Sequence, residues 1–365
     1  FGNTALLTTI LTYHVLAGAV PSRDVPRGTN IETVQGENIV VNRGDSTLVI
    51  TDARGRTSNI TFTNIDTSNG VIHRVDRVIL PLSLPQLNIV QAARVTPSLS
   101  ILVEAVVAAG LADTLSTETV TVFAPTNAAF AALLAELGIS KEALLANKAL
   151  LTQVLSYHVL GTRVLRNEVP LGKAIEPLDG GFFKVEAGTS LRITDGRNRV
   201  SQITTTDVLA RNGVVHVVDR VLLPANQDIV DTAQSLPEFS VLVEAVIAAD
   251  LVSALQNAAA LTVFAPTNAA FATLLAELGL SKEALFANKP LLTQVLTYHV
   301  LGARVLKAEV PVGTAIATLQ GQTFTIGADL QITDRRGRTS QIIGTDVFTS
   351  NGVIHVIDRV LLPAA

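Results

Sequence analysis

Six histidines are the side chains of this sequence best suited to acid–base chemistry or metal binding. They occupy two repeated phrases, a tyrosine-histidine pair and a closing phrase of the form Asn-Gly-Val-x-His. The pairs are Tyr13-His14, Tyr157-His158 and Tyr298-His299, and the closing histidines are His73, His216 and His355. No His-x-x-x-His or His-Glu-x-x-His spacing occurs, and His216 and Asp219 would point to opposite faces of a strand. We therefore expect structural histidines, half-buried and hydrogen-bonded to backbone, with neither a metal nor a cofactor.

Other catalytic patterns point the same way. The sequence has no cysteine, no Gly-x-Ser-x-Gly phrase and no glycine-rich phosphate loop after an expected strand. The tyrosines before the histidines suit an apolar ring with one hydrogen-bonded hydroxyl. The residues therefore predict a protein that is not an enzyme.

The composition predicts compact folding. Hydrophobic residues make up 48% of the 365 residues and charged residues 16%, which excludes disorder. A net charge of −4 provides no basic surface for nucleic acid. Glu104 and Glu244 interrupt the most apolar runs, so we expect no membrane-spanning segment. Because the chain begins at Phe1 without a methionine, we expect that upstream residues were removed or lie outside this sequence.

Domain-sized repeats explain where the histidines lie. Residues 121–161 and 262–302 match at 36 of 41 positions, and both begin with TVFAPTNAAF. The phrase SNGVIHRVDRVILP at 68–81 recurs, slightly changed, at 211–224 and 350–363. A period near 140 residues indicates whole domains in tandem, which we call the first (1–81), second (85–224) and third (225–363) repeats. The linkers between them are short, so we expect a fairly stiff string of domains.

Each complete repeat predicts helices followed by strands. Leu99, Leu102, Val103, Val106 and Val107 form one apolar helical stripe. TVFAP predicts a short strand, and the helix boundaries after it are expected at Thr126 or Asn127, Gly138, Ser140 and Asn147. Beyond the tyrosine-histidine pair the apolar period changes to two, which predicts an antiparallel sheet. The predicted fold class is therefore α+β.

The first repeat holds only the second half of this pattern. Phe1 aligns with Leu145, so the counterpart of roughly 85–144 is missing, including the TVFAP strand. We expect this to leave an apolar sheet face uncovered. Two explanations stay open: truncation of a longer chain, and completion by a partner chain.

Three ordered phrases, TVFAPTNAAF, Tyr-His and NGVVHVVDRVLLP, resemble the hallmarks of the fasciclin, or FAS1, domain. Residues 85–224 and 225–363 resemble complete domains, and 1–81 resembles a C-terminal half. The resemblance implies a wedge-like β-sandwich flanked by helices. It also implies an extracellular or cell-surface protein of adhesion, matrix or surface assembly. The family is not generally enzymatic, although some algal members resemble carriers of carotenoid pigments.

Three aspartates, Asp66, Asp207 and Asp346, precede the closing phrase. In animal relatives an aspartate followed by an aliphatic residue near this place is implicated in receptor adhesion. Asp207-Val208 and Asp346-Val347 have that form, and Asp66 does not. Turn aspartates that accept hydrogen bonds from nearby backbone explain the same pattern, and we favour that interpretation.

Two arginine patterns are candidate contact sites. Arg43-Gly44-Asp45 is the tripeptide that animal integrins recognise. The alternative is a polar turn between two strands, which favours glycine and aspartate for structural reasons. Arginine pairs also recur on three expected hairpin turns: Arg54 and Arg56, Arg197 and Arg199, Arg336 and Arg338. Alternate residues of an extended chain share a face, so each pair could bind acidic glycans or carboxylates. A solvated turn that protects a hairpin edge is the alternative.

Taken together, the sequence predicts a non-enzymatic, secreted or surface-attached protein that mediates adhesion or builds an extracellular assembly. Its expected partners are other surface proteins, glycans or copies of itself, because several weak contacts on one chain add through effective concentration. The alternative is a carrier of a lipophilic ligand such as a carotenoid.

Overall fold

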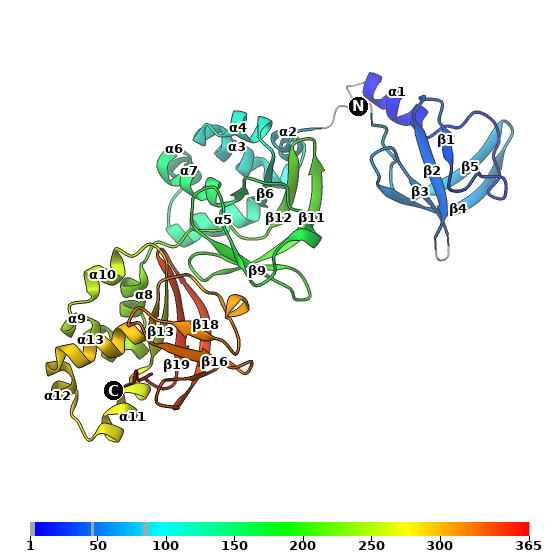
Figure 1. The fold of residues 1–365 in the computed structure, drawn as a ribbon. Coiled ribbons are helices and arrows are strands. Elements are labelled where there is room, and N and C mark those ends of the chain that lie inside the picture. Colours follow the sequence, from blue (N-terminus) through cyan, green and yellow to red (C-terminus); the bar gives the residue numbers. More distant parts are fainter. Residues whose placement is uncertain (1–3, 45–46, 83–86, 365) are drawn as a thin grey trace. The chain divides into compact units, whose positions relative to one another are not determined.

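The computed structural model describes residues 4–44, 47–82 and 87–364. The chain divides into two compact units, Phe1–Leu87 and Asn88–Ala365, and each is described by itself. The first unit holds the first repeat, and the second unit holds the second and third repeats (Figure 1).

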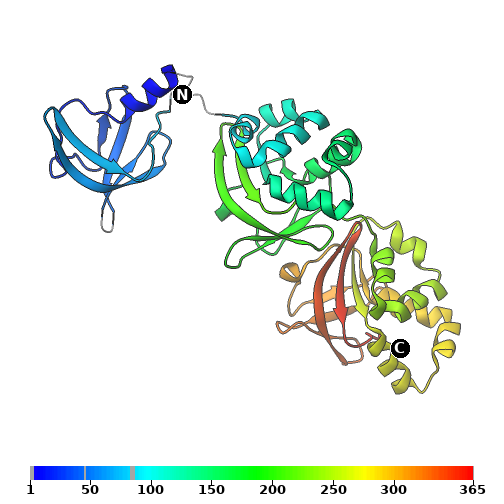
Figure 2. The same ribbon diagram turned by 180° about the vertical axis from the view of Figure 1, so that it is seen from behind.

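One helix and a five-stranded antiparallel sheet form the first unit (Figures 1 and 2). The helix is α1 (Thr4–Tyr13), and the strands, in spatial order, are β1 (Asn30–Glu32), β2 (Asn38–Arg43), β3 (Leu48–Thr51), β4 (Thr57–Thr67) and β5 (Gly70–Val75). Tyr13, Val41 and Ile60 are buried in its core, where aliphatic side chains predominate. The Tyr13 hydroxyl donates to the carbonyl of Asn38 and accepts from the Ala53 N–H, so it joins the helix to two parts of the sheet.

In the second unit, each of the two repeats has its own helix layer and its own sheet. The helices of the second repeat are α2 (Ile89–Arg94), η1 (Pro97–Leu99), α3 (Ser100–Ala109), α4 (Ala112–Thr117), α5 (Asn127–Leu137), α6 (Lys141–Ala146), α7 (Lys148–Tyr157) and η2 (Arg166–Glu168). Its strands are β6 (Val120–Pro125), β7 (Val159–Leu160), β8 (Ala174–Ile175), β9 (Phe183–Glu186), β10 (Arg192–Thr194), β11 (Val200–Ala210) and β12 (Gly213–Val218).

The third repeat follows the same order of elements. Its helices are α8 (Ile229–Ser235), η3 (Pro237–Phe239), α9 (Ser240–Ala248), α10 (Val252–Gln256), α11 (Asn268–Leu278), α12 (Lys282–Ala287), α13 (Lys289–Tyr298) and η4 (Lys307–Glu309). Its strands are β13 (Leu261–Pro266), β14 (Val300–Leu301), β15 (Ala315–Ala317), β16 (Thr323–Ile326), β17 (Gln331–Thr333), β18 (Thr339–Thr349) and β19 (Gly352–Ile357). The predicted α+β class with flanking helices is confirmed.

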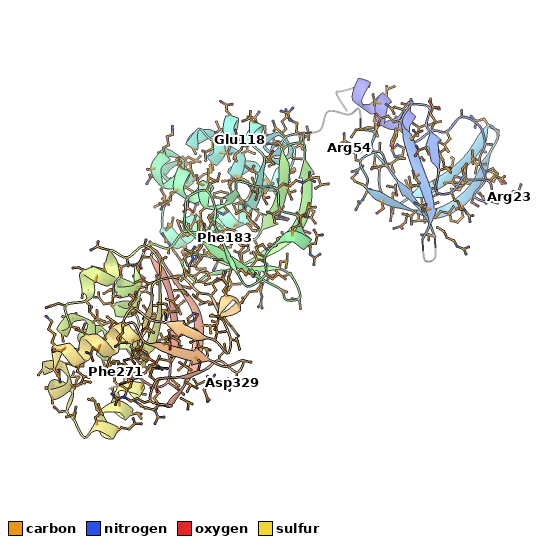
Figure 3. All side chains as sticks on the ribbon, viewed as in Figure 1. Arg23, Arg54, Glu118, Phe183, Phe271 and Asp329 are labelled. Atoms are coloured by element: carbon orange, nitrogen blue, oxygen red, sulfur yellow. The ribbon has the colours of Figure 1, made fainter. Side chains whose placement is uncertain are left out.

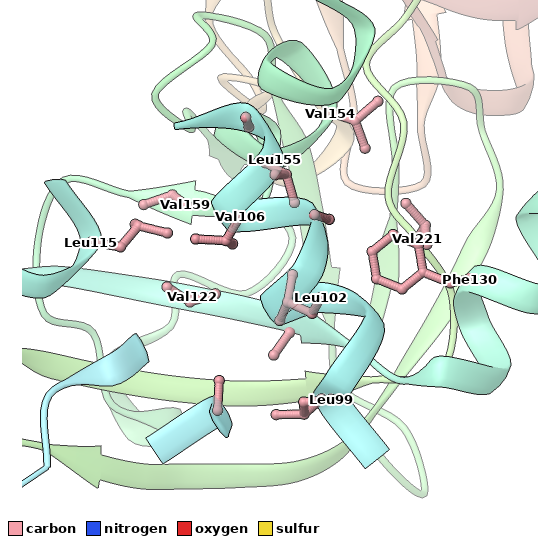
Figure 4. Close-up of a cluster of buried hydrophobic side chains, with 14 of the residues drawn as sticks. Leu99, Leu102, Val106, Leu115, Val122, Phe130, Val154, Leu155, Val159 and Val221 are labelled. Atoms are coloured by element: carbon pink, nitrogen blue, oxygen red, sulfur yellow. The ribbon is translucent and has the colours of Figure 1, made fainter. Parts of the chain in front are cut away.

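Each sheet of the second unit is curled and seven-stranded, in the order β7-β6-β12-β11-β10-β9-β8 and its counterpart in the third repeat. The TVFAP strand β6 pairs in parallel with β12. Its alternate side chains point to opposite faces of the sheet and pack into two different apolar cores. Phe123 packs edge-to-face on Phe183 in one core, whereas Val122 lies in the core under the helices. Figure 3 labels Phe183, and Figure 4 labels Val122. Two apolar cores, one inside the curl and one under the helices, therefore hold each complete repeat together.

Local signals set the helix ends much as the sequence predicts. The Thr126 hydroxyl accepts from the Ala129 N–H and caps α5, which ends at Gly138 with φ of 65°. Ser140 and Asn147 cap α6 and α7. The expected stripe on α3 needs one correction, because Val107 is 53% exposed and belongs to the solvent face.

The described residues of the first unit include no counterpart of β6, and the closing phrase shows the consequence. An added Cβ at Gly213 would lie 1.8 Å from the Val120 carbonyl oxygen, so only glycine lets β12 approach β6. At the equivalent Gly70 nothing lies within 4 Å among the described residues. Phe62 and Ile72, on the neighbouring strands β4 and β5, are 55% and 53% exposed. The expectation of an uncovered apolar face in the first repeat is confirmed.

Candidate functional site

The longest strand of each repeat contains a left-handed residue that bends it. Asn64, Asp207 and Asp346 have φ of 58°, 56° and 59°, a conformation that asparagine and aspartate tolerate better than most residues. The pairing register shifts at the same place in β4, β11 and β18, as expected for a bulge. We call these residues and the two that follow each of them the Asx corners: Asn64–Asp66, Asp207–Leu209 and Asp346–Phe348.

A histidine of the closing phrase holds each Asx corner. The backbone N–H groups of Asp207 and Asp346 donate to Nδ1 of His216 and His355, at 3.3 Å in both repeats. The opposite ring nitrogen Nε2 lies 3.0 and 2.9 Å from the carbonyls of Val164 and Val305. This arrangement requires a neutral ring that accepts at Nδ1 and donates at Nε2. The closing histidines therefore position the corner, with both ring nitrogens bonded to backbone.

The side chain of the left-handed residue ties the corner to a neighbouring loop. One carboxylate oxygen of Asp207 accepts from the Arg166 N–H and one of Asp346 from the Lys307 N–H, both at 2.8 Å. In the first unit the Asn64 side chain accepts from the Ser22 N–H at 2.8 Å. Asn64, and not Asp66, is thus the structural counterpart of the two aspartates, which corrects the grouping that the sequence suggests.

In the third repeat, side chains of the second repeat cover the Asx corner. Lys184 Nζ lies 2.9 Å from Asp346 Oδ2 and 3.1 Å from Glu186 Oε1. The Lys184 and Asp346 side chains are only 10% and 3% exposed. Burial alone would lower the pKa of Lys184, but its hydrogen bonds and the charges of Asp346 and Glu186 raise it. The ammonium group therefore stays charged in a buried ion pair.

Aromatic and backbone contacts surround this ion pair. The rings of Phe182 and Phe348 lie 4.8 Å apart, and the Arg304 guanidinium lies 4.1 Å from the Phe182 ring centre. Asn198 accepts from the Phe348 N–H at 2.7 Å and donates to the Phe348 carbonyl at 3.1 Å. Leu306 and Val353 complete a small buried cluster with the two phenylalanines. We call Phe182, Lys184 and Asn198 the docking residues.

The equivalent surface of the second repeat is exposed. Val208 and Leu209 are 37% and 51% exposed, whereas Phe348, the counterpart of Leu209, is 2% exposed. The other contacting residues have counterparts as well: Arg163 for Arg304, Leu165 for Leu306 and Val214 for Val353. The second repeat therefore presents a complete Asx corner that no described residue of the second unit covers.

The histidines after the tyrosines serve a different structural role. In His158 and His299, Nδ1 lies 2.7 Å from the carbonyl four residues earlier, and Nε2 accepts from the N–H of Leu222 or Leu361 at 2.9 Å. Burial lowers the pKa of both histidines to about 4, although their backbone hydrogen bonds oppose the shift. Both rings are neutral at neutral pH and join a helix end to the last segment of the repeat. In the first unit His14 makes the same two bonds, to Ile10 and Ile79.

Each hairpin arginine bonds to its own repeat, and binding of an outside anion by these pairs stays a prediction. The first arginine of each pair donates through Nε to a proline carbonyl: Arg54 to Pro81, Arg197 to Pro224 and Arg336 to Pro363. The second binds acidic side chains of its own repeat: Arg56 binds Asp52, Arg199 binds Asp195 and Glu136, and Arg338 binds Glu277. These bonds tie the two arginines of each pair to different partners within the repeat and stabilise the hairpin.

The Arg-Gly-Asp tripeptide begins at the end of a strand of the first unit. Arg43 ends β2 and the Gly44 N–H donates to the Thr47 carbonyl, whereas Asp45 lies outside the described residues. Among the residues that the structure describes, no cluster of three His, Asp or Glu side chains could hold a metal ion. No helix in this described part of the chain is both long and apolar enough to cross a membrane.

Sequence reasoning missed the docking residues. Their counterparts are Asn38, Val40 and Gly55 in the first repeat and Thr323, Thr325 and Gly337 in the third. A phenylalanine, a lysine and an asparagine that stand where the other repeats have small, aliphatic or polar residues are a detectable signal. Only the structure shows that all three contact one surface.

Tandem α+β modules with a curled sheet, a covering helix layer and a histidine-held corner define the class of protein. The family model described as "Fasciclin domain" matches residues 1–81, 97–224 and 237–363. The chain therefore belongs to the fasciclin domain family.

Two curated relatives illustrate the range of similarity. The chain is 27% identical to human periostin over 369 residues. The alignment covers all of this chain and 41% of periostin. It is 42% identical over 150 residues to protein sll1483 of Synechocystis sp., covering 40% of this chain and 79% of that protein. The chain thus spans less than half the length of periostin.

A solved FAS1 domain pair from the insect cell adhesion molecule fasciclin I is also similar. It superposes with a TM-score of 0.38 at 20% identity and covers 73% of this chain and 97% of that one.

Proposed function

We propose that this chain is a non-enzymatic adhesion or assembly protein of the cell surface or extracellular space, and that it binds partners through the Asx corner of its second repeat. We further propose that 85–224 and 225–363 are complete fasciclin domains and that 1–81 is the C-terminal half of another. Family membership supports the adhesive class, because the resemblance to fasciclin domains implies adhesion, matrix or surface assembly.

One observation carries the proposal: the same corner is filled by protein in the third repeat and is exposed in the second. The filled corner of the third repeat contacts an aromatic ring, a lysine ammonium and a side-chain amide that pairs with backbone, which supports the same preference for the second repeat. Asp207 supplies the carboxylate for a lysine, and the exposed Leu209 supplies an apolar contact for a ring.

The partner should therefore present an aromatic and a basic side chain from one hairpin. The first and third repeats do not offer this combination, because the counterparts of the docking residues there are neutral and not aromatic. A hairpin of another surface protein fits the corner better than a second copy of the first or third repeat.

The test uses a backbone-cyclised peptide of residues 180–200, which contains all three docking residues. Beads coated with this peptide should adhere to a surface coated with the full chain. Asp207→Lys should abolish adhesion, because it places two positive charges together. Asp66→Lys, the same change of charge at an exposed residue outside the left-handed position, is the control and should leave adhesion intact. Adhesion that survives both Asp207→Lys and Leu209→Asp would refute the proposal.

A further inference from the structure

An apolar cavity of about 110 Å³ lies between the helices and the sheet of the third repeat. The corresponding cavity of the second repeat measures about 30 Å³. These cavities lie in the cores under the helices and share no residue with the Asx corners or the docking residues. Because the two repeats are so similar in sequence, a difference of this size requires a local cause.

The shared lining does not cause the difference. Every residue that lines the smaller cavity has a counterpart of the same type in the larger one. Examples are Ile89 and Ile229, Leu102 and Leu242, Val122 and Val263, His158 and His299. The extra space must therefore come from residues that line only the larger cavity.

The short helix before the TVFAP strand provides that space. Helix α4 has six residues and α10 has five, and the connection to the strand is longer in the third repeat. Leu115 on α4 is buried, whereas its counterpart Leu255 on α10 is only half-buried. Ala254 and Ala258 line the larger cavity, and a threonine occupies the position of Ala254 in the second repeat. The less buried Leu255 and the two alanines thus accompany the larger open volume beside α10 in the third repeat.

We propose that this cavity binds a compact, uncharged apolar molecule of up to about six carbon atoms, since an apolar protein cavity of about 150 Å³ stays dry and binds benzene. The two polar side chains of the lining already bond to backbone: His299 through both ring nitrogens, and Thr297 through its hydroxyl, which donates to the Thr293 carbonyl. Leu319, which lines the cavity and is 55% exposed, marks its opening to solvent. A long polyene exceeds this volume, so the inferred ligand differs from a carotenoid.

The test is a titration of the full chain with benzene, followed by methyl NMR spectroscopy. The methyl signals of Val263 and Ile354, which line the larger cavity, should shift and saturate. The signals of Val106 and Val122 in the second repeat are internal controls and should shift at least tenfold less. Xenon dissolved under pressure should perturb the same third-repeat signals in the unmodified chain.

A matched pair of variants sharpens the result. Ala258→Phe should fill the cavity and abolish the shifts, whereas Ala259→Phe, at the exposed neighbouring residue, should leave them intact. Equal shifts in both repeats, or no saturable shift with either benzene or xenon in the unmodified chain, would overturn the inference.

Discussion

The second and third repeats share a fold and most of their sequence, yet the same surface is exposed in one and buried in the other. Asp346 and Phe348 lie under Lys184 and Phe182, whereas Leu209, the counterpart of Phe348, is exposed to solvent. The corner itself barely differs, because His355 and His216 hold it with the same two hydrogen bonds. The difference comes from the docking residues, which only the second repeat carries.

This comparison shows how a duplicated module acquires separate roles. Three side chains on the hairpins of the second repeat contact the Asx corner of the third repeat and bury it. The module keeps its corner for structural reasons, since the same residues tie a loop and a histidine into the fold. A copy whose corner stays uncovered is then available for an outside partner.

The largest effect is expected from Asp346→Lys. It removes the partner of a buried ammonium group and adds a second positive charge, and breaking a buried ion pair costs about 3–5 kcal/mol. The free energy of unfolding, measured with denaturant, should fall by this amount. Asp207→Lys, at the equivalent half-buried position that has no lysine partner among the described residues of the second unit, should cost about 1 kcal/mol, the value of one hydrogen bond. Equal costs at the two positions would contradict the difference in burial.

Acid should lower the free energy of unfolding of both the second and the third repeat. An unfolded histidine takes up a proton near pH 6.5, but His158 and His299 do so only near pH 4 when folded. Between these values the unfolded state binds more protons, so stability is full above pH 6.5 and falls as the pH is lowered towards 4. The loss should reach about 3 kcal/mol per histidine at 1.36 kcal/mol per pH unit.

Denaturant unfolding across this pH range measures the effect. His299→Gln should remove part of the pH dependence in this window, because His158 and His355, whose pKa burial also lowers, contribute in the same direction. An unchanged slope in the variant would show that other groups cause the acid sensitivity.

Asn198→Gly should have a smaller effect that is confined to the contact between repeats. Asn198 has φ of 61°, so glycine keeps the turn but loses both hydrogen bonds to Phe348. The loss should be about 1–2 kcal/mol, since each such bond contributes roughly 1 kcal/mol. The measurement is hydrogen exchange of the Phe348 amide, which should become faster. Gly337→Asn, at the equivalent turn of the third repeat, should leave that amide unchanged.

The smallest effect on stability is expected from Leu209→Ser. This side chain is half exposed, and surface substitutions usually change stability by less than about 0.5 kcal/mol. Adhesion to the peptide of residues 180–200 should nevertheless weaken at least fivefold, because Leu209 would lose its apolar contact. Thermal unfolding and bead adhesion, measured on the same preparation, separate the two effects.

Much of the fold follows from local sequence signals. The caps Thr126 and Ser140 and the stop at Gly138 act within one helical turn, so their chemistry predicts the boundaries. The TVFAP strand is equally clear, because Pro125 ends it. Tandem repeats and their α+β class follow from the ordered phrases.

The candidate site was harder to predict, because its contacts join residues far apart in the chain. Asn64 takes the place expected for Asp66 through a bulge that shifts the register of β4. Arg199 turned out to bind Asp195 and Glu136 inside its own repeat, which no hairpin pattern reveals. The ion pair between Lys184 and Asp346 spans 162 residues and needs both repeats to be folded.

Hydroxyl-radical footprinting of the intact chain tests the central comparison most directly. Leu209 should be oxidised readily and Phe348 should be protected, even though an accessible phenylalanine reacts readily with the radical. Oxidation of Phe348 to the extent of an exposed phenylalanine such as Phe62, or protection of Leu209 in the free chain, would contradict the account.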